Sequence, residues 1–91
     1  MFISVIHRIS DLEAFSATAA SAVNDIPADI KLHQTVTSND RSTAICLWEA
    51  ASVDVVRDLL EPLFGRVSKN EYIPIDPSRS MGLPTAASAT A

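Results

Sequence analysis

The alternation of apolar and polar residues predicts a strand and then a helix in the first part of the chain. Residues 2–9, FISVIHRI, are rich in β-branched side chains and apolar on both faces of a strand, which is typical of a central strand. Residues 10–13, SDLE, have the form of a capping box, so we expect Ser10 to cap a helix that Pro27 ends. Apolar residues at spacings of three and four predict the buried face of this helix: Leu12, Phe15, Ala19, Val23 and Ile26.

The middle of the chain predicts two strands, over about residues 30–37 and 43–49, that are joined by a tight turn. The turn, Ser38 to Arg41, contains Asn39 and Asp40, which tolerate the positive φ angles of tight turns. One face of the first of these strands should carry Lys31, His33, Thr35 and Thr37. In the second strand, Ile45 and Leu47 should lie on one face and Ala44, Cys46 and Trp48 on the other.

A second helix follows these strands. Ser52 is its expected N-cap, and Asp54 in the first turn suits the positive end of the helix dipole. Pro62 and Gly65 predict where the helix ends. Its apolar face should comprise Val56, Leu59, Leu60 and Leu63.

A last strand, over about residues 71–75, completes the order β-α-β-β-α-β. Pro74 favours an edge position for this strand because proline has no backbone N–H to donate. The order predicts an α+β fold, the ferredoxin-like plait, with antiparallel sheet order 4-1-3-2. We expect one domain over residues 1–76, followed by a low-complexity tail over residues 77–91.

Composition points to a partner for the sheet face that the two helices of such a plait leave open. The 91 residues are 47% hydrophobic but only 5% aromatic, so small aliphatic side chains build the core. An exposed apolar face is a liability, and a homodimer that pairs two sheets as a dimeric α+β barrel would cover it. We expect Trp48 at or near that interface.

Charge and cysteine content exclude several classes of protein. The net charge of −4 argues against binding to nucleic acid or to an anionic membrane surface. The single Cys cannot form an internal disulfide, and no apolar run approaches the length of a membrane span. We therefore expect a cytoplasmic protein.

His33 and Cys46 are the first candidates for chemistry. An even-length turn centred on Asn39-Asp40 sets them opposite each other, with β-carbons about 4.5–5.5 Å apart. An imidazole and a thiolate at that distance could share Ni or Zn, with His7 as a third ligand. Alternatively, Cys46 is a small buried hydrophobe beside a surface His, or a nucleophile that His33 activates, for which no oxyanion donor is evident.

A ligand cavity between the sheet and the helices is the second candidate site. His7, Arg8 and Lys31 could line it and hold an acidic small molecule, and Trp48 could pack on the ligand. The segment from residue 70 to 72, Asn-Glu-Tyr, could supply further polar groups. Alternatively, the basic residues are strand ends in solvent and Trp48 is core. The sequence has no Gly-rich phosphate loop, CxxC or HExxH motif and no catalytic-triad spacing.

Two segments, AICLWEA (44–50) and NEYIPID (70–76), resemble motifs of a family of short ferredoxin-like proteins of unknown function that includes a nickel-binding branch. The resemblance spans about residues 2–76 and implies the plait and the dimer. The second helix, VVRDLLEPLFGRV, lacks the His residues in which the nickel-binding branch is rich, so a second subunit would have to complete a metal site. The metal ligands that the resemblance carries over are His7, His33 and Cys46.

Three functions are compatible with these patterns. The favoured one is a small dimeric protein that binds a small ligand or a transition metal and has no catalysis of its own. The second is an enzyme of the dimeric α+β barrel type, such as a cofactor-free monooxygenase or an isomerase, with His7 or His33 as its base. The third is a purely structural interaction module.

Overall fold

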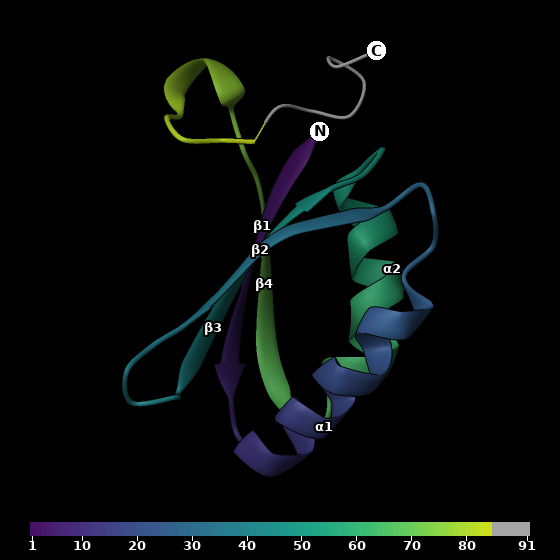
Figure 1. Cartoon of the computed structure of the whole chain (residues 1–91), viewed down its shortest axis with the longest axis vertical. Coiled ribbons are helices and arrows are strands. Elements are labelled where there is room, and N and C mark those ends of the chain that lie inside the picture. The colour runs from purple at the N-terminus through teal and green to yellow at the C-terminus, as the bar shows by residue number, and fades with distance from the viewer. Residues whose placement is uncertain (85–91) are drawn as a thin grey trace.

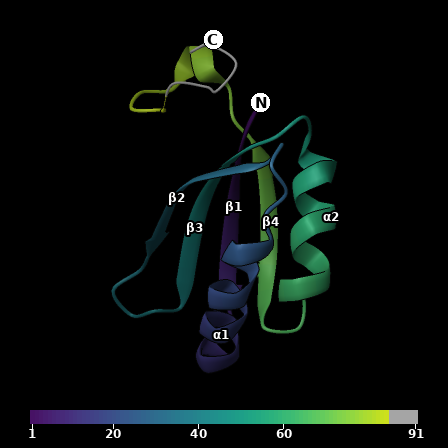
Figure 2. The same ribbon diagram turned by 45° about the vertical axis from the view of Figure 1, so that its right-hand side comes forward.

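Two helices lie on one face of a four-stranded antiparallel sheet in the computed structural model, which describes residues 1–84 (Figure 1, Figure 2). The elements along the chain are β1 (Phe2–Ile9), α1 (Leu12–Ala22), β2 (Lys31–Thr37), β3 (Thr43–Glu49), α2 (Val53–Phe64) and β4 (Ser68–Pro74), with short 3-10 helices at Val23–Asp25 and Pro77–Arg79. The sheet order β2-β3-β1-β4 confirms the predicted ferredoxin-like plait, with β1 central and β4 at an edge. Part of the predicted tail, residues 85–91, lies outside the described residues.

The central strand β1 sets the two faces of the sheet. Its odd-numbered residues Ile3, Val5 and His7 are buried beneath the helices, and they form the middle of the core. Both β1 and β3 have the bounds that the sequence predicts. The last strand β4 begins at Ser68, earlier than the predicted residue 71, because a tight turn brings Val67 N to Phe64 O and lets Ser68 pair with Ile9.

The first helix differs from its prediction at both ends. Asp11 is the N-cap, and its carboxylate accepts a hydrogen bond from Ala14 N at 3.0 Å, so the assignment of the cap to Ser10 is wrong. The predicted apolar face is also only partly correct, because Leu12 is 39% exposed and Val23 is 55% exposed. The α-helix ends at Ala22 and the chain continues as a 3-10 helix over Val23–Asp25, so the 3.6-residue period that predicts Val23 on the apolar face ends before it.

The second helix follows its prediction closely. The Ser52 hydroxyl caps it by accepting from Val55 N, and it ends at Phe64, just before Gly65. Its buried residues are Val56, Leu60 and Phe64, whereas Leu59 is half-buried and Leu63 is 43% exposed.

The two faces of the sheet differ in what covers them. Trp48 lies on the face beneath the helices and is 4% exposed, which corrects the expectation that it lies at or near a dimer interface on the open face. The open face nevertheless carries exposed aliphatic side chains, since Val36 on β2 is 47% and Ile45 on β3 is 42% exposed. Register places five aliphatic side chains on this open face: Ile6, Val36, Ile45, Leu47 and Ile73.

We expect Asp11→Ala to lower the free energy of unfolding by about 1 kcal/mol, because it removes the acceptor that caps α1. The matched control is Ser10→Ala, which should change it by less than about 0.5 kcal/mol, since no capping bond depends on the Ser10 hydroxyl. Urea denaturation followed by circular dichroism measures both. A larger loss from Ser10→Ala than from Asp11→Ala would contradict the observed cap.

Candidate functional site

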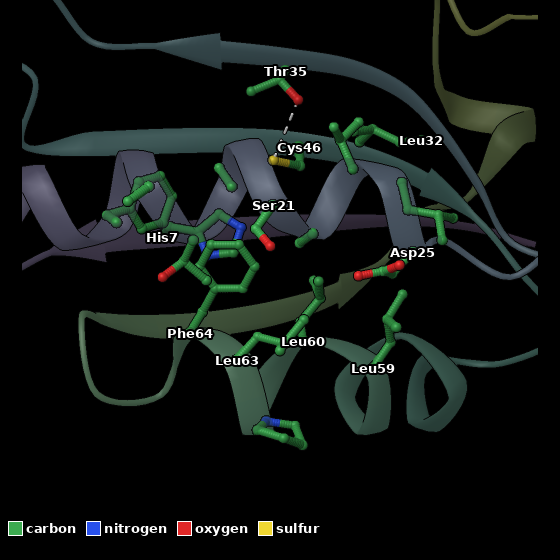
Figure 3. A pocket seen from close by; sticks show the side chains of 18 of the residues that line it. His7, Ser21, Asp25, Leu32, Thr35, Cys46, Leu59, Leu60, Leu63 and Phe64 are labelled. Carbon is green, nitrogen blue, oxygen red and sulfur yellow. Dashed lines mark hydrogen bonds between the residues drawn. The ribbon is translucent and has the colours of Figure 1, made fainter.

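A cavity of about 720 Å³ lies between the two helices and the sheet (Figure 3). Most of its lining is apolar and comes from α1, α2 and the helix-covered face of the sheet. Figure 3 shows Cys46 and Thr35 on the strands, with Leu59, Leu60 and Leu63 on the α2 side. The cavity therefore occupies the place where the sequence predicts a ligand.

The composition of α1 leaves this space open. Its sequence, LEAFSATAASA, supplies mostly Ala, Ser and Thr, and none of the residues Leu12–Ala22 is fully buried. On the opposite wall, Thr35 faces Cys46, so the sheet also presents small side chains there. Because protein interiors are normally close-packed, a helix whose apolar side is only half covered marks space for an additional group.

His7 is the most buried ionisable group of this site. It projects from β1 into the helix-covered face, is 2% exposed and lines the cavity. The rings of Phe15 and Phe64 hold its imidazole, with ring centroids 5.2 Å and 5.4 Å away. Its Nδ1 atom lies 2.6 Å from Oδ1 of Asn70, the residue that pairs with it across β1 and β4.

A hydrogen-bond network continues from Asn70 to the outside of α2. Asn70 Nδ2 donates to Glu61 Oε2 at 2.7 Å, and the Tyr72 hydroxyl donates to the same oxygen. The Ser68 hydroxyl donates to Asn70 Oδ1 at 2.7 Å. The cavity histidine is thus connected through one amide to a carboxylate near the surface.

Burial and these bonds shift the pKa values of the network. Burial lowers the pKa of His7 below its ordinary value, and the bond to Asn70 and the charge of Glu61 oppose this shift only in part. The hydrogen bond from Tyr72 is the largest cause that lowers the pKa of Glu61, while burial raises the pKa of Tyr72. At neutral pH the site therefore holds a neutral imidazole, an ionised carboxylate and a protonated phenol.

Cys46 is a buried thiol in the same cavity. Burial raises its pKa, and its sulfur accepts a hydrogen bond from the Thr35 hydroxyl at 3.6 Å. A thiol with a raised pKa is protonated at neutral pH and is a poor nucleophile. This environment argues against the nucleophile interpretation of Cys46.

The predicted pairing of His33 with Cys46 is wrong, because Thr35 is the partner of Cys46. The turn is centred on Asp40 and Arg41, where Arg41 takes a positive φ of 63°. The carboxylate of Asp40 accepts hydrogen bonds from the neighbouring serines, which fixes the turn in this position. The predicted turn is centred one residue earlier, on Asn39 and Asp40. The pairing of β2 with β3 is therefore shifted from the predicted register.

A β-bulge then moves His33 to the open face of the sheet. The pairing shifts between Leu32 and Gln34, which leaves His33 as the extra residue. There its Nε2 lies 2.8 Å from Glu49 Oε1, and its ring packs against Phe2 at 5.7 Å between centroids. His33 and Cys46 thus lie on opposite faces of the sheet.

The predicted metal ligands are therefore not brought together in one chain. Only His7 and Cys46 share the cavity. Within residues 1–84, no group of three or more His, Cys, Asp and Glu side chains is placed where it could hold a metal ion. Binding of Ni or Zn by His7, His33 and Cys46 stays a prediction that this geometry does not support.

The predicted cavity residues also divide between the two faces. Trp48 lines the cavity, and its buried indole N–H has no hydrogen-bond partner in the described part of the chain. Arg8 and Lys31 do not line this cavity, because both are exposed on strand positions that alternate away from the helices. Arg8 instead lies 4.0 Å from Glu71, and Lys31 is paired with Glu49 in the sheet.

Glu61 is the member of the site that the sequence does not reveal. The sequence indicates Asn70 and Tyr72 as candidates, because they are polar residues in a predicted strand segment. Glu61 has the pattern of an ordinary charged residue on the polar side of an amphipathic helix. Only the packing of α2 beside β4 brings its carboxylate to Asn70 and Tyr72. Sequence spacing carries no signal for this contact, because it joins two elements.

Comparison with models of known protein families finds no match, and a search of curated proteins finds no similar sequence. The resemblance to the family with a nickel-binding branch therefore rests on the quoted segments alone and stays a prediction. Within residues 1–84, none of the helices combines the length and the apolar character that crossing a bilayer requires.

We expect the protein to lose stability as the pH falls below about 6.5, the ordinary pKa of histidine, because His7 must be neutral to stay buried. Its folded pKa is lower than its unfolded pKa, so the unfolded chain binds the proton first. The contribution of neutral His7 to the free energy of unfolding is fully present above its pKa in the unfolded chain. It is lost as the pH falls through the lower pKa that His7 has in the folded protein.

Urea denaturation of the wild type and of His7→Phe between about pH 7.5 and pH 5 tests this expectation. As the pH is lowered, the free energy of unfolding should decrease less steeply in the variant than in the wild type. His33 is present in both proteins, so the difference between the two slopes reports on His7. Equal slopes would show that the imidazole of His7 is not held neutral by burial.

Proposed function

We propose that this protein binds a small, mostly apolar organic molecule in the cavity between its helices and its sheet. The observation that carries the proposal is the cavity itself, whose volume of about 720 Å³ falls in the range of ligand pockets. Its lining also has the usual character of such pockets, an apolar wall with a few polar groups. Binding of this kind needs no catalysis by the chain.

The physical cost of leaving the cavity empty supports the same proposal. A pocket that opens to solvent leaves the apolar surface of its lining in contact with water. Here the exposed lining includes the apolar side of α1, which packs only partly on the core through Phe15, Ala19 and Ala22. A bound apolar molecule would cover this surface, as a side chain would in a filled core.

The neutral fluorescent probe N-phenyl-1-naphthylamine tests whether the cavity accepts such molecules. We expect saturable binding to the wild type. Ala19→Leu should weaken it by roughly tenfold or more, because Ala19 lines the cavity and the larger side chain occupies probe volume. Ala20→Leu is the matched control, since Ala20 is an exposed residue of the same helix outside the lining.

The two alanine variants distinguish the cavity from other apolar surface. Binding that Ala20→Leu leaves unchanged and Ala19→Leu weakens would support the proposal. Binding that is absent from the wild type, or that both variants leave unchanged, would contradict it. Circular dichroism of each variant establishes that the fold is retained.

We also propose that the open face of the sheet pairs with the same face of a second copy. This face carries aliphatic side chains from all four strands: Ile6, Val36, Ile45, Leu47 and Ile73. Charged residues of both signs surround them, including Arg8, Lys69 and Glu71, so a two-fold arrangement can bring opposite charges together. Such a dimer would bury the exposed parts of Val36 and Ile45.

Sedimentation velocity tests the dimer. We expect twice the monomer mass for the wild type and the monomer mass for Ile45→Lys, which places a charge in the centre of the open face. Leu63→Lys is the control, because Leu63 has a similar exposure, 43%, but lies on α2. A wild type that sediments as a monomer would exclude the dimer and leave the cavity proposal untouched.

Catalysis is the second candidate function, and the position of His7 is the observation that favours it. A neutral imidazole inside an apolar cavity has the protonation state that a general base needs. An enzyme of the cofactor-free monooxygenase or isomerase type would use it to remove a proton from a bound ring compound. To support this candidate, the wild type must turn over a substrate. The His7→Gln variant must bind the same substrate without turning it over.

A further inference from the structure

We propose that the ligand of this cavity carries a hydroxyl group, which donates a hydrogen bond to Nε2 of His7. This inference rests on the proposed function, since it specifies the chemistry of the molecule that the cavity binds. It follows from the order of donors and acceptors along the network from Glu61 to His7. Each step of that order is fixed by the step before it.

The carboxylate of Glu61 fixes the orientation of the Asn70 amide. An ionised carboxylate can only accept hydrogen bonds, and Glu61 already accepts one from the Tyr72 hydroxyl. The group of Asn70 that lies 2.7 Å from Glu61 Oε2 must therefore be the amide NH₂. The amide oxygen is then on the other side, where it accepts from the Ser68 hydroxyl.

The Asn70 oxygen in turn fixes the tautomer of His7. An amide oxygen has no proton to give, so the Nδ1 atom 2.6 Å away must be the donor. A neutral imidazole carries one proton, and burial favours the neutral form of His7. Nε2 therefore presents a lone pair, and it is an acceptor.

This acceptor is unused in the protein by itself. Within residues 1–84, the hydrogen bond of His7 to Asn70 is made by Nδ1, and Nε2 makes none. Among the described residues, Trp48 Nε1 is the one fully buried side-chain polar atom without a partner, so Nε2 of His7 keeps some exposure to the cavity that the side chain lines. A ligand that fills the cavity removes water from Nε2, and a ligand that brings an O–H group avoids the cost of leaving this acceptor without a donor.

The surroundings of His7 favour a flat apolar body for the molecule that carries the hydroxyl. The imidazole lies between Phe15 and Phe64, and both phenyl rings and the Trp48 indole line the cavity. A ring compound can pack edge to face or offset on such side chains. The carboxylate of Asp25 is the other strong acceptor of the lining, but Asp25 is an exposed residue.

Two probes of nearly equal size, 2-naphthol and 2-methylnaphthalene, separate the hydroxyl from the apolar body. Isothermal titration calorimetry with the wild type should show roughly fivefold or tighter binding of 2-naphthol, because only this probe can donate to Nε2. Equal binding of the two probes would overturn the inference and leave the proposed function standing. Binding of neither probe would overturn the proposed function and the inference with it.

Two variants assign the preference to His7. In His7→Phe the probes should bind equally well, and the variant should fold because Asn70 Oδ1 keeps Ser68 as its donor. Ala20→Leu is the matched control and should retain the preference for 2-naphthol, because Ala20 is exposed on α1 and lies outside the lining. A preference that survives in His7→Phe, or that disappears in Ala20→Leu, would overturn the assignment to Nε2.

The tautomer can be measured without any ligand. Nitrogen-15 NMR of the imidazole in the free protein should show a protonated Nδ1 and an unprotonated Nε2 for His7. Glu61→Leu removes the carboxylate that orients the Asn70 amide, so it should allow the other tautomer to appear. A protonated Nε2 in the wild type would overturn the inference whatever the binding data show.

Discussion

The central position of β1 is the constraint on which the rest of this structure depends. Because β1 pairs with β3 on one side and β4 on the other, its alternation decides which side chains of all three strands meet the helices. Ile3 and Val5 supply the middle of the core, and His7 continues the same face to the region beneath Phe15 and Phe64. The site is thus an extension of the core in which one apolar position is replaced by an imidazole.

The cavity and the buried histidine have a common physical origin. Small residues in α1 leave the helix only partly packed, and this opens space against the same sheet face that carries His7. A fully packed core would leave no room for a ligand. A histidine on the surface could form hydrogen bonds with water, whereas a buried one depends on a partner in the protein. Here the hydrogen bond to Asn70 orients the imidazole while the cavity keeps its other edge accessible to a bound molecule.

Much of the fold could be predicted because local patterns were strong. The bounds of β1 and β3, the cap at Ser52 and the edge position of β4 all follow from β-branched runs, a capping side chain and a proline. The cap of α1 was harder, because Ser10 and Asp11 are adjacent residues of similar capping tendency, and in the structure the helix begins after Asp11.

The sequence by itself determined the order of elements and the separation of Ala44, Cys46 and Trp48 from Ile45 and Leu47, because these depend on local periodicity. Tertiary structure alone decided which residues meet. A shift of the turn and one bulge separated His33 from Cys46, since side chains alternate with a period of two and each added residue reverses the face. The approach of α2 to β4 brought Glu61 to Asn70, and no local pattern encodes a contact between two separate elements.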